Sequence, residues 1–287
     1  MGDRITLGIG LGVLAYTLFA LHDASNKWLV ATLPVWQVMT CRSATIVVAV
    51  LIFGRGKLVQ RAAATPLKRA LIARSLITMT AWLLYYTAAR SMPLAQLMTL
   101  YYSAPLITML LAIPLLGERI NATRWISAAL GFTGVLVASD PFGVRFTLAT
   151  GLVLAASAMW GYAIVLMRQI ARRESSMLQM LYQNLVFLIC MGSVTAFTWT
   201  TPSGLDAVLL VAIGILGGLG QFTLFEAVRL APASVMSTVE YSGLVWAFTL
   251  GYLVWGDIPS AAICAGAALI AASGVFLAVM EHRAAKA

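Results

Sequence analysis

Apolar runs of about twenty residues follow one another along the whole chain, separated by short segments that contain charged residues, proline or glycine. A run of about 20 apolar residues is long enough to cross the hydrocarbon core of a bilayer as a helix. Hydrophobic residues make up 61% of the chain and charged residues only 10%, whereas a soluble domain has about 25% charged residues. The sequence therefore predicts an all-α, polytopic membrane protein with the lipid bilayer as its surroundings.

The breaks between the apolar runs predict ten spans. The runs lack the period-two alternation of barrel strands, and lipid requires every backbone group to be paired, so helices are favoured. The helices are expected near residues 4–22, 33–53, 68–90, 94–116, 121–139, 147–168, 176–199, 205–229, 233–255 and 259–281.

Basic residues are distributed unevenly between the two sides of these spans. The net charge of +9 would suggest nucleic acid for a soluble protein, but here the Lys and Arg residues lie between apolar runs. With the N-terminus inside, 15 of the 19 fall on the inner side, 3 on the outer side, and Arg42 within a span. Because cytoplasmic loops are rich in Lys and Arg, we expect a multi-pass protein of the inner (plasma) membrane. Both termini are then cytoplasmic, and no nucleic-acid partner is expected.

Two segments of the chain repeat one pattern. The stretch ARSMPLAQLMTLYYSAPLITMLLAIPLLGE at 89–118 aligns without gaps with VRLAPASVMSTVEYSGLVWAFTLGYLVWGD at 228–257. Chance would match some leucines, but hardly the polar and turn positions. The identical pairs include Arg90/Arg229, Pro93/Pro232, Thr99/Thr238, Tyr102/Tyr241, Ser103/Ser242 and Gly117/Gly256.

The repeat predicts two units of five helices each, at residues 1–140 and 141–287. Because five is odd, the second unit must enter the membrane upside down relative to the first. Inverted repeats that meet around a midplane site are typical of secondary transporters.

The sequence offers no pattern for catalysis, a metal or a cofactor. The glycine-rich stretches lack the Lys-Ser/Thr of a phosphate loop, and no His, Cys, Asp and Glu cluster has ligand spacing. The small-residue spacings Gly8/Gly12 and Gly214/Gly218 favour close helix packing. We therefore expect no enzyme activity and no cofactor.

Aromatic residues gather in the expected spans at 68–90 and 94–116. Trp82 and Tyr86 are four residues apart on one helical face, and Tyr102, Trp160 and Tyr241 lie deep in their spans. These side chains either line a cavity or pack between helices. A cavity of aromatic rings with scattered hydroxyls would suit a small amphipathic molecule.

Few charged residues lie within the spans, and each is a functional candidate because a charge in lipid is costly. Glu240, beside Tyr241, is a candidate contact for a proton or a substrate amine, because burial disfavours the charged form of a carboxyl. It could equally hydrogen-bond an ammonium or a tyrosine without titrating. Glu226 precedes Arg229 by three residues and favours an interfacial ion pair. Arg42 favours a structural tie to a carbonyl or an acid over a carboxylate receptor.

Pro105 and Pro114 interrupt the span at 94–116. A proline within a helix frees a carbonyl and bends the axis. The two positions predict either a fixed kink or a hinge.

The charged, proline, tyrosine and glycine positions that the two halves share resemble the pattern of a known family. The first half has R-S-M-P-L-A-Q, Y-Y-S-A-P and G-E-R, and the second has R-L-A-P-A-S, Y-S-G and G-D-I. Over essentially its whole length the chain resembles the ten-helix EamA branch of the drug/metabolite transporter superfamily. It is similar there to bacterial inner-membrane exporters of aromatic and other neutral amino acids. The usual Trp-Gly pair stands at Trp160-Gly161, but the first span has Ala20-Leu21 instead, so no site residue is assigned there.

The resemblance implies a secondary transporter that exports small amphipathic metabolites by alternating access, with amino acids as the first substrate class. Export would be driven by the substrate gradient or coupled to protons. The alternatives are an exporter of another metabolite or drug class, and a non-transporting scaffold or channel-like protein. The implied cavity is built by the spans at 68–90, 94–116, 205–229 and 233–255, with those at 4–22 and 147–168, and is closed at its ends by those at 121–139 and 259–281.

Overall fold

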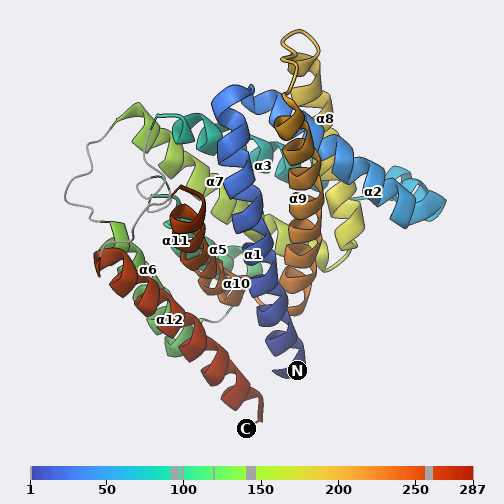
Figure 1. Ribbon diagram of the computed structural model, residues 1–287. Helices are drawn as coiled ribbons and strands as arrows, with labels where there is room; N and C mark the ends of the chain where they lie inside the picture. Colours follow the sequence, from blue (N-terminus) through green and yellow to red (C-terminus); the bar gives the residue numbers. More distant parts are fainter. Residues whose placement is uncertain are drawn as a thin grey trace.

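The computed structural model of the chain is a bundle of helices (Figure 1). It describes residues 2–91, 97, 100–118, 120–139, 147–255 and 261–286. The helices are α1 (Gly2–Thr32), α2 (Val35–Ala64), α3 (Lys68–Ala89), α5 (Ala104–Leu116), α6 (Ala122–Ser139), α7 (Leu148–Ala171), α8 (Ser176–Thr195), α9 (Gly204–Leu230), α10 (Ala233–Glu240), α11 (Ser242–Trp255) and α12 (Ala261–Lys286). No strand occurs among these described residues, so the all-α prediction is confirmed. The number of ten spans stays a prediction.

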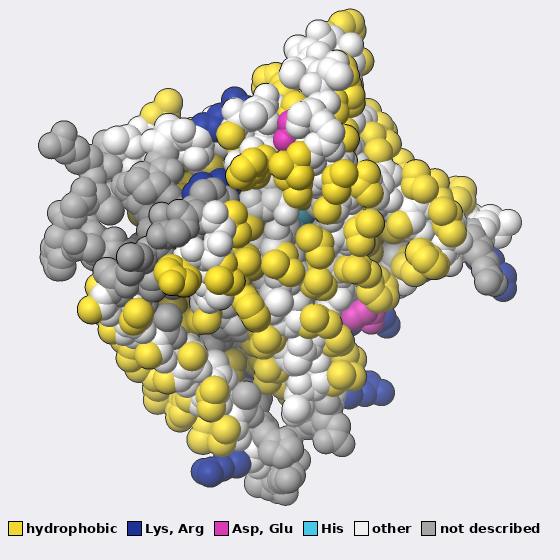
Figure 2. Space-filling view, viewed as in Figure 1, with side chains coloured by type: hydrophobic (Ala, Val, Ile, Leu, Met, Phe, Trp, Pro, Cys, Tyr) yellow, Lys and Arg dark blue, Asp and Glu magenta, His cyan; other side chains and the backbone are white. Residues whose placement is uncertain are grey.

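The outside of the bundle is apolar. Within the described ranges, α1, α2, α7, α8 and α9 are long and apolar enough to cross a membrane. Phe53 is 73% exposed, Ile189 68% and Leu253 69%. Figure 2 shows hydrophobic side chains over most of the visible face, with Lys and Arg mainly towards its edges. A surface of this kind matches acyl chains better than water.

The first two helices are longer than the sequence predicted. The first span was expected near 4–22, but α1 continues to Thr32, because residues 23–32 contain neither proline nor glycine and Pro34 follows. α2 continues past the expected end at residue 53 to Ala64 and stops just before Thr65. The extra turns of α1 place Asp23 within a helix, where its side chain can face the interior of the bundle.

The spans expected at 94–116 and 233–255 are broken at equivalent positions. In the second half, a turn at Tyr241 separates α10 from α11, and in the first half a turn at Tyr102 and Ser103 precedes α5. Pro105 lies in the first turn of α5 rather than in a helix interior. Leu244 occupies the equivalent position in the second half, so proline alone does not explain the break.

The largest contacts between the two halves are reciprocal. In the repeat, α1, α2, α3 and α5 correspond to α7, α8, α9 and α11. The contact of α1 with α9 therefore corresponds to that of α7 with α3, and the contact of α2 with α9 to that of α8 with α3. In the same way, the contact of α11 with α1 corresponds to that of α5 with α7. α2 and α8, and also α6 and α12, pair equivalent helices across the centre. Such reciprocity is expected when two similar units face each other across a two-fold axis. The predicted boundary at 140 and 141, and the repeat positions Pro93, Thr99 and Gly256, lie outside the described residues.

Connections between helices gather at two opposite ends, as spans of alternating direction require. At one end, the Arg61 guanidinium of α2 binds Glu174 beyond α7 at 3.0 Å. At the other end, Gln37 Nε2 donates to the Thr200 carbonyl at 2.6 Å. The start of α1 and the end of α12 lie at the same end (Figure 1). The charge distribution predicts that this end faces the cytoplasm.

Glycines let the helices approach closely, as their spacing predicted. A Cβ at Gly214 would lie 2.5 Å from the Thr45 Cβ, and one at Gly12 would lie 2.9 Å from the Val239 Cγ1. A Cβ at Gly8 would lie 2.8 Å from the Ala231 Cβ and 3.3 Å from the Ala227 carbonyl oxygen. The prediction of close packing at these glycines is confirmed.

We expect Gly8→Ala to lower the free energy of unfolding by about 1–3 kcal/mol, because the new methyl meets backbone that cannot turn aside. Gly10→Ala is the matched control on the same helix, since nothing lies within 4 Å of its Cβ position. Thermal unfolding of both variants in detergent measures the difference. Equal midpoints would contradict the close contact of α1 with the end of α9.

Candidate functional site

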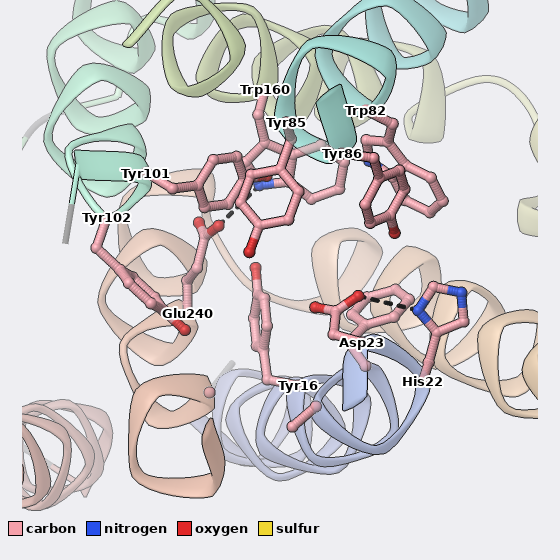
Figure 3. Close-up of a pocket in the computed structure, with 13 residues that line it drawn as sticks. Tyr16, His22, Asp23, Trp82, Tyr85, Tyr86, Tyr101, Tyr102, Trp160 and Glu240 are labelled. Atoms are coloured by element: carbon pink, nitrogen blue, oxygen red, sulfur yellow. Dashed lines mark hydrogen bonds and ion pairs between the residues drawn. The ribbon is translucent and has the colours of Figure 1, made fainter. Parts of the chain in front are cut away.

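A cavity lies where the broken helices meet α1, α3 and α7 (Figure 3). The cavity is small, with a volume of about 80 Å³. Its described lining is largely aromatic and contains two acids. The lining residues are Tyr16, Phe19, Ala20, His22, Asp23, Trp82, Tyr85, Tyr86, Tyr101, Tyr102, Trp160, Glu240 and Gly243.

Glu240 is the last residue of α10 and lies directly at the helix break. Its side chain is buried, and Trp160 Nε1 of α7 donates a hydrogen bond of 2.8 Å to its Oε1 (Figure 3). None of the ion pairs formed within the described residues includes Glu240. The carboxyl is therefore held by an indole donor and pairs with no cation among the described residues.

The aromatic wall comes mainly from α3. Trp82, Tyr85 and Tyr86 lie three and four residues apart, so one face of the helix carries all three rings. The ring centres of Trp82 and Trp160 are 6.4 Å apart, and those of Tyr85 and Tyr101 are 4.8 Å apart. These rings give the cavity an apolar wall edged with hydroxyl groups.

The two repeat-related tyrosines occupy different places. Tyr102 lines the cavity, and Gly243 leaves room for its hydroxyl, which would lie 2.7 Å from a Cβ at that position. Tyr241 does not border the cavity, so its assignment to the lining needs correction. The turn directs its ring towards Gly131 of α6, where only a glycine leaves space. Tyr241 packs behind Tyr102 instead, with 5.8 Å between ring centres.

A second acid, Asp23, reaches the cavity from α1. His22 Nδ1 lies 3.0 Å from its Oδ1, and Arg42 Nε donates to His22 Nε2 at 3.0 Å. Since Nε2 accepts from Arg42, we assign the imidazole proton to Nδ1, which donates it to Asp23. Hydrogen bonds thus link the partly exposed Asp23 through a neutral, buried histidine to a buried arginine.

Arg42 has further partners within the bundle. Its guanidinium lies 4.5 Å from the Trp82 ring centre and donates to the Asn184 side chain and the Gly217 carbonyl. Glycine is required at 217, because a Cβ there would lie 2.6 Å from Arg42 Nε. The predicted tie of Arg42 to a carbonyl is confirmed, and its link to an acid runs through His22.

The cavity opens towards the end that holds the α1–α2 connection. Asp23, Tyr85 and Tyr86 also line a neighbouring hollow that contains Lys27 and Ala89. Those last two residues border a third hollow, which reaches the α1–α2 turn and the loop after α8. The three hollows trace a route from the central cavity to that end of the molecule.

The opposite end is closed by packing and by a carboxylate. Met236 and Val239 of α10 are buried in the main core. Glu118, the acid after Gly117, accepts from the backbone N–H groups of Ala233 and Ser234 at 2.9 and 3.2 Å. It also accepts from the Ser234 hydroxyl at 2.7 Å. This carboxylate of the first half thus caps the start of α10 in the second half.

The other sequence-predicted features lie away from the cavity. Glu226 and Arg229 form the predicted ion pair at 2.7 Å. α9, at the span expected near 205–229, contributes no described lining residue, because α1 lies between it and the cavity.

Sequence reasoning missed the lining residues of α1, and also Tyr85, Tyr101 and Gly243. The absent Trp-Gly pair left the first span unassigned, and its expected end at 22 placed Asp23 only at the outer end of that span. The spacing of Tyr16, Phe19, Ala20 and Asp23 by three and four residues was the available signal, because it places them on one helical face.

Comparison with known proteins agrees with this architecture. A sequence profile of the EamA-like transporter family matches the chain twice, over residues 6–139 and 147–280. One solved crystal structure superposes with a TM-score of 0.78 at 20% identity, covering 98% of both chains. At that identity the likeness shows a shared fold.

Several characterised transporters are similar in sequence. An S-adenosylmethionine uptake transporter of Rickettsia felis is 26% identical over 282 residues, covering 96% of this chain and 94% of the relative. The pseudopaline exporter CntI of Pseudomonas aeruginosa is 28% identical over 285 residues, covering 96% and 97%. A riboflavin transporter of Vibrio cholerae is 25% identical over 203 residues, covering 70% and 67%. With the family profile matching both halves, the chain belongs to the EamA-like transporter family and is a membrane transporter rather than an enzyme.

Proposed function

We propose that the protein is a secondary transporter that exports small amphipathic metabolites across the inner membrane by alternating access. The observation that carries the proposal is the cavity between the two helix breaks, open towards one end and closed towards the other. Units 1–140 and 141–287 would exchange conformations, so that the closed end opens as the open end closes. With both termini cytoplasmic, the present opening faces away from the cytoplasm.

Amino acids with aromatic or other neutral side chains are the first substrate class that we propose. The rings of Trp82, Tyr86, Tyr102 and Trp160 would contact the apolar part, and Glu240 would bind the amine. The relatives carry names for three different substrates, which favours another metabolite class as the second candidate. The narrow cavity implies that ring side chains move aside when any such substrate enters.

Counterflow in liposomes containing the purified protein tests transport directly. Unlabelled phenylalanine inside should accelerate the entry of labelled phenylalanine, because a carrier that returns loaded exchanges substrate across the membrane. Acceleration by a different metabolite alone would favour the second candidate. The absence of counterflow across a broad panel of solutes would favour a scaffold or channel-like protein instead.

The cavity rings should set the preference for aromatic substrates. We expect Trp160→Ala or Tyr102→Ala to lower transport of phenylalanine at least about tenfold more than transport of alanine, because a large substrate loses its contact surface. Trp199→Ala is the control, since this tryptophan is 54% exposed in the loop after α8. A uniform loss for all substrates at equal expression would point to packing damage instead.

Coupling to protons should depend on Glu240. We expect Glu240→Gln to remain folded and to abolish the response of transport to an imposed pH gradient, because the amide cannot take up or release a proton. The other titratable groups around the cavity, Asp23, His22 and the tyrosines, stay unchanged in this variant. Wild-type transport that ignores the gradient would remove proton coupling and leave facilitated export.

A further inference from the structure

We infer that the cavity recognises its substrate by a positive charge, an ammonium or another organic cation, and that its described lining offers no cationic partner to a carboxylate. This inference rests on the proposed transport function and, within it, ranks amines and other organic cations above amino acids, whose carboxylate finds no cation in the described lining. It follows from where the charges around the cavity lie and which of them are already neutralised within the protein.

Acids dominate the charged groups of the described lining. Asp23 and Glu240 border the cavity, whereas no Lys or Arg does so among the described lining residues. Opposite charges are what a buried substrate must find, because an ion removed from water without a partner is costly. The lining is therefore complementary to a cation.

The two acids differ in their surroundings. Asp23 hydrogen-bonds His22, which accepts from Arg42, so a buried arginine balances its charge through one neutral ring. Glu240 accepts from the neutral Trp160 indole, and none of the ion pairs among the described residues includes it. An incoming cation thus gains most at Glu240, where its charge would complete an ion pair.

Two basic residues lie close to the cavity without lining it: Lys27 borders the neighbouring hollow, and Arg42 is buried beside Trp82 and committed to other partners. Arg42 is 1% exposed, and its N–H groups serve His22, Asn184 and Gly217. The ring of Trp82 lies beside its guanidinium at 4.5 Å. A substrate carboxylate would have to displace these contacts to reach it.

Aromatic groups reinforce the preference for a cation. Figure 3 shows Tyr101, Tyr102 and Trp160 gathered around Glu240, with Tyr16 and Tyr85 pointing towards each other beside them. Aromatic faces attract ammonium groups, and phenol oxygens accept their hydrogen bonds. The apolar body of the substrate would then lie towards Trp82 and Tyr86, where the rings continue.

Three small molecules with the same phenyl body separate the possible determinants. Phenethylamine carries only the ammonium, phenylalanine carries both charges, and 3-phenylpropionate carries only the carboxylate. Each is titrated against the purified full-length protein in detergent, and the rise in unfolding temperature reports binding. We expect phenethylamine to bind at least about tenfold more tightly than phenylalanine. The carboxylate of bound phenylalanine would lack a cationic partner, and one unpaired buried polar group lowers affinity by about that factor. We expect 3-phenylpropionate to give no stabilisation.

Glu240→Gln should abolish the tenfold preference, because it removes the charge that selects the cation. Glu226→Gln is the matched control and should keep it, since Glu226 pairs with Arg229 away from the cavity. The melting temperatures without ligand report whether each variant folds. Retained preference in Glu240→Gln would overturn the assignment.

The remaining outcomes test this inference separately from the proposed function. Phenylalanine binding as tightly as phenethylamine, or no stabilisation by phenethylamine, overturns cation recognition even when counterflow shows a working transporter. Selective phenethylamine binding that Glu240→Gln abolishes supports the cation site even when counterflow is absent and transport fails.

Discussion

Lipid offers no hydrogen bonds, so a helix can break within the membrane only where protein or water satisfies the freed backbone groups. This constraint locates the site. The turns at Tyr102 and Tyr241 interrupt two equivalent helices, and both turns lie at the centre of the bundle. Ser103 satisfies part of the first break by donating to the Leu100 carbonyl at 2.8 Å. Beside the second break, the buried hydroxyls of Tyr241 and Ser242 have no hydrogen-bond partner among the described residues.

The same breaks connect the site to the ends of the molecule. Each half-helix can tilt without bending a continuous helix, and α10 is held at its start by Glu118 of the other half. Release of that carboxylate would free the end that is now closed. Because the main contacts between the halves are reciprocal, a similar rearrangement at the opposite end would mirror this one. In the proposed alternating-access mechanism, this hydrogen-bonded cap would control access from the closed end.

Much of this arrangement could be predicted from the sequence. Apolar run length predicted the helices, the repeat predicted two units, and depth within the spans identified Trp82, Tyr86, Tyr102, Trp160 and Glu240, which the structure brings to one cavity. The prediction of helices succeeded because membrane spans follow simple periodic rules. The equivalence of Tyr102 and Tyr241 in the repeat also marks the place where both helices break.

The remaining features depend on tertiary contacts that no local pattern encodes. Tyr241 turns away from the cavity because Gly131, distant in sequence, leaves space for its ring. Arg42 donates to His22 across the contact between α2 and α1, which no spacing within either helix predicts. Asp23, expected at the outer end of the first span, lies well inside α1 because the helix continues to Thr32.

The central claim is that one cavity is reached alternately from both sides of the membrane. Ala20 lines this cavity and is small, so Ala20→Cys can carry a reporter thiol once Cys41, Cys190 and Cys264 are replaced. Its reaction with a membrane-impermeant thiol reagent is measured in right-side-out and inside-out vesicles, with and without substrate. The account predicts labelling from both faces, with substrate slowing the reaction on each. Labelling from one face only, under every substrate condition, would contradict alternating access through this cavity.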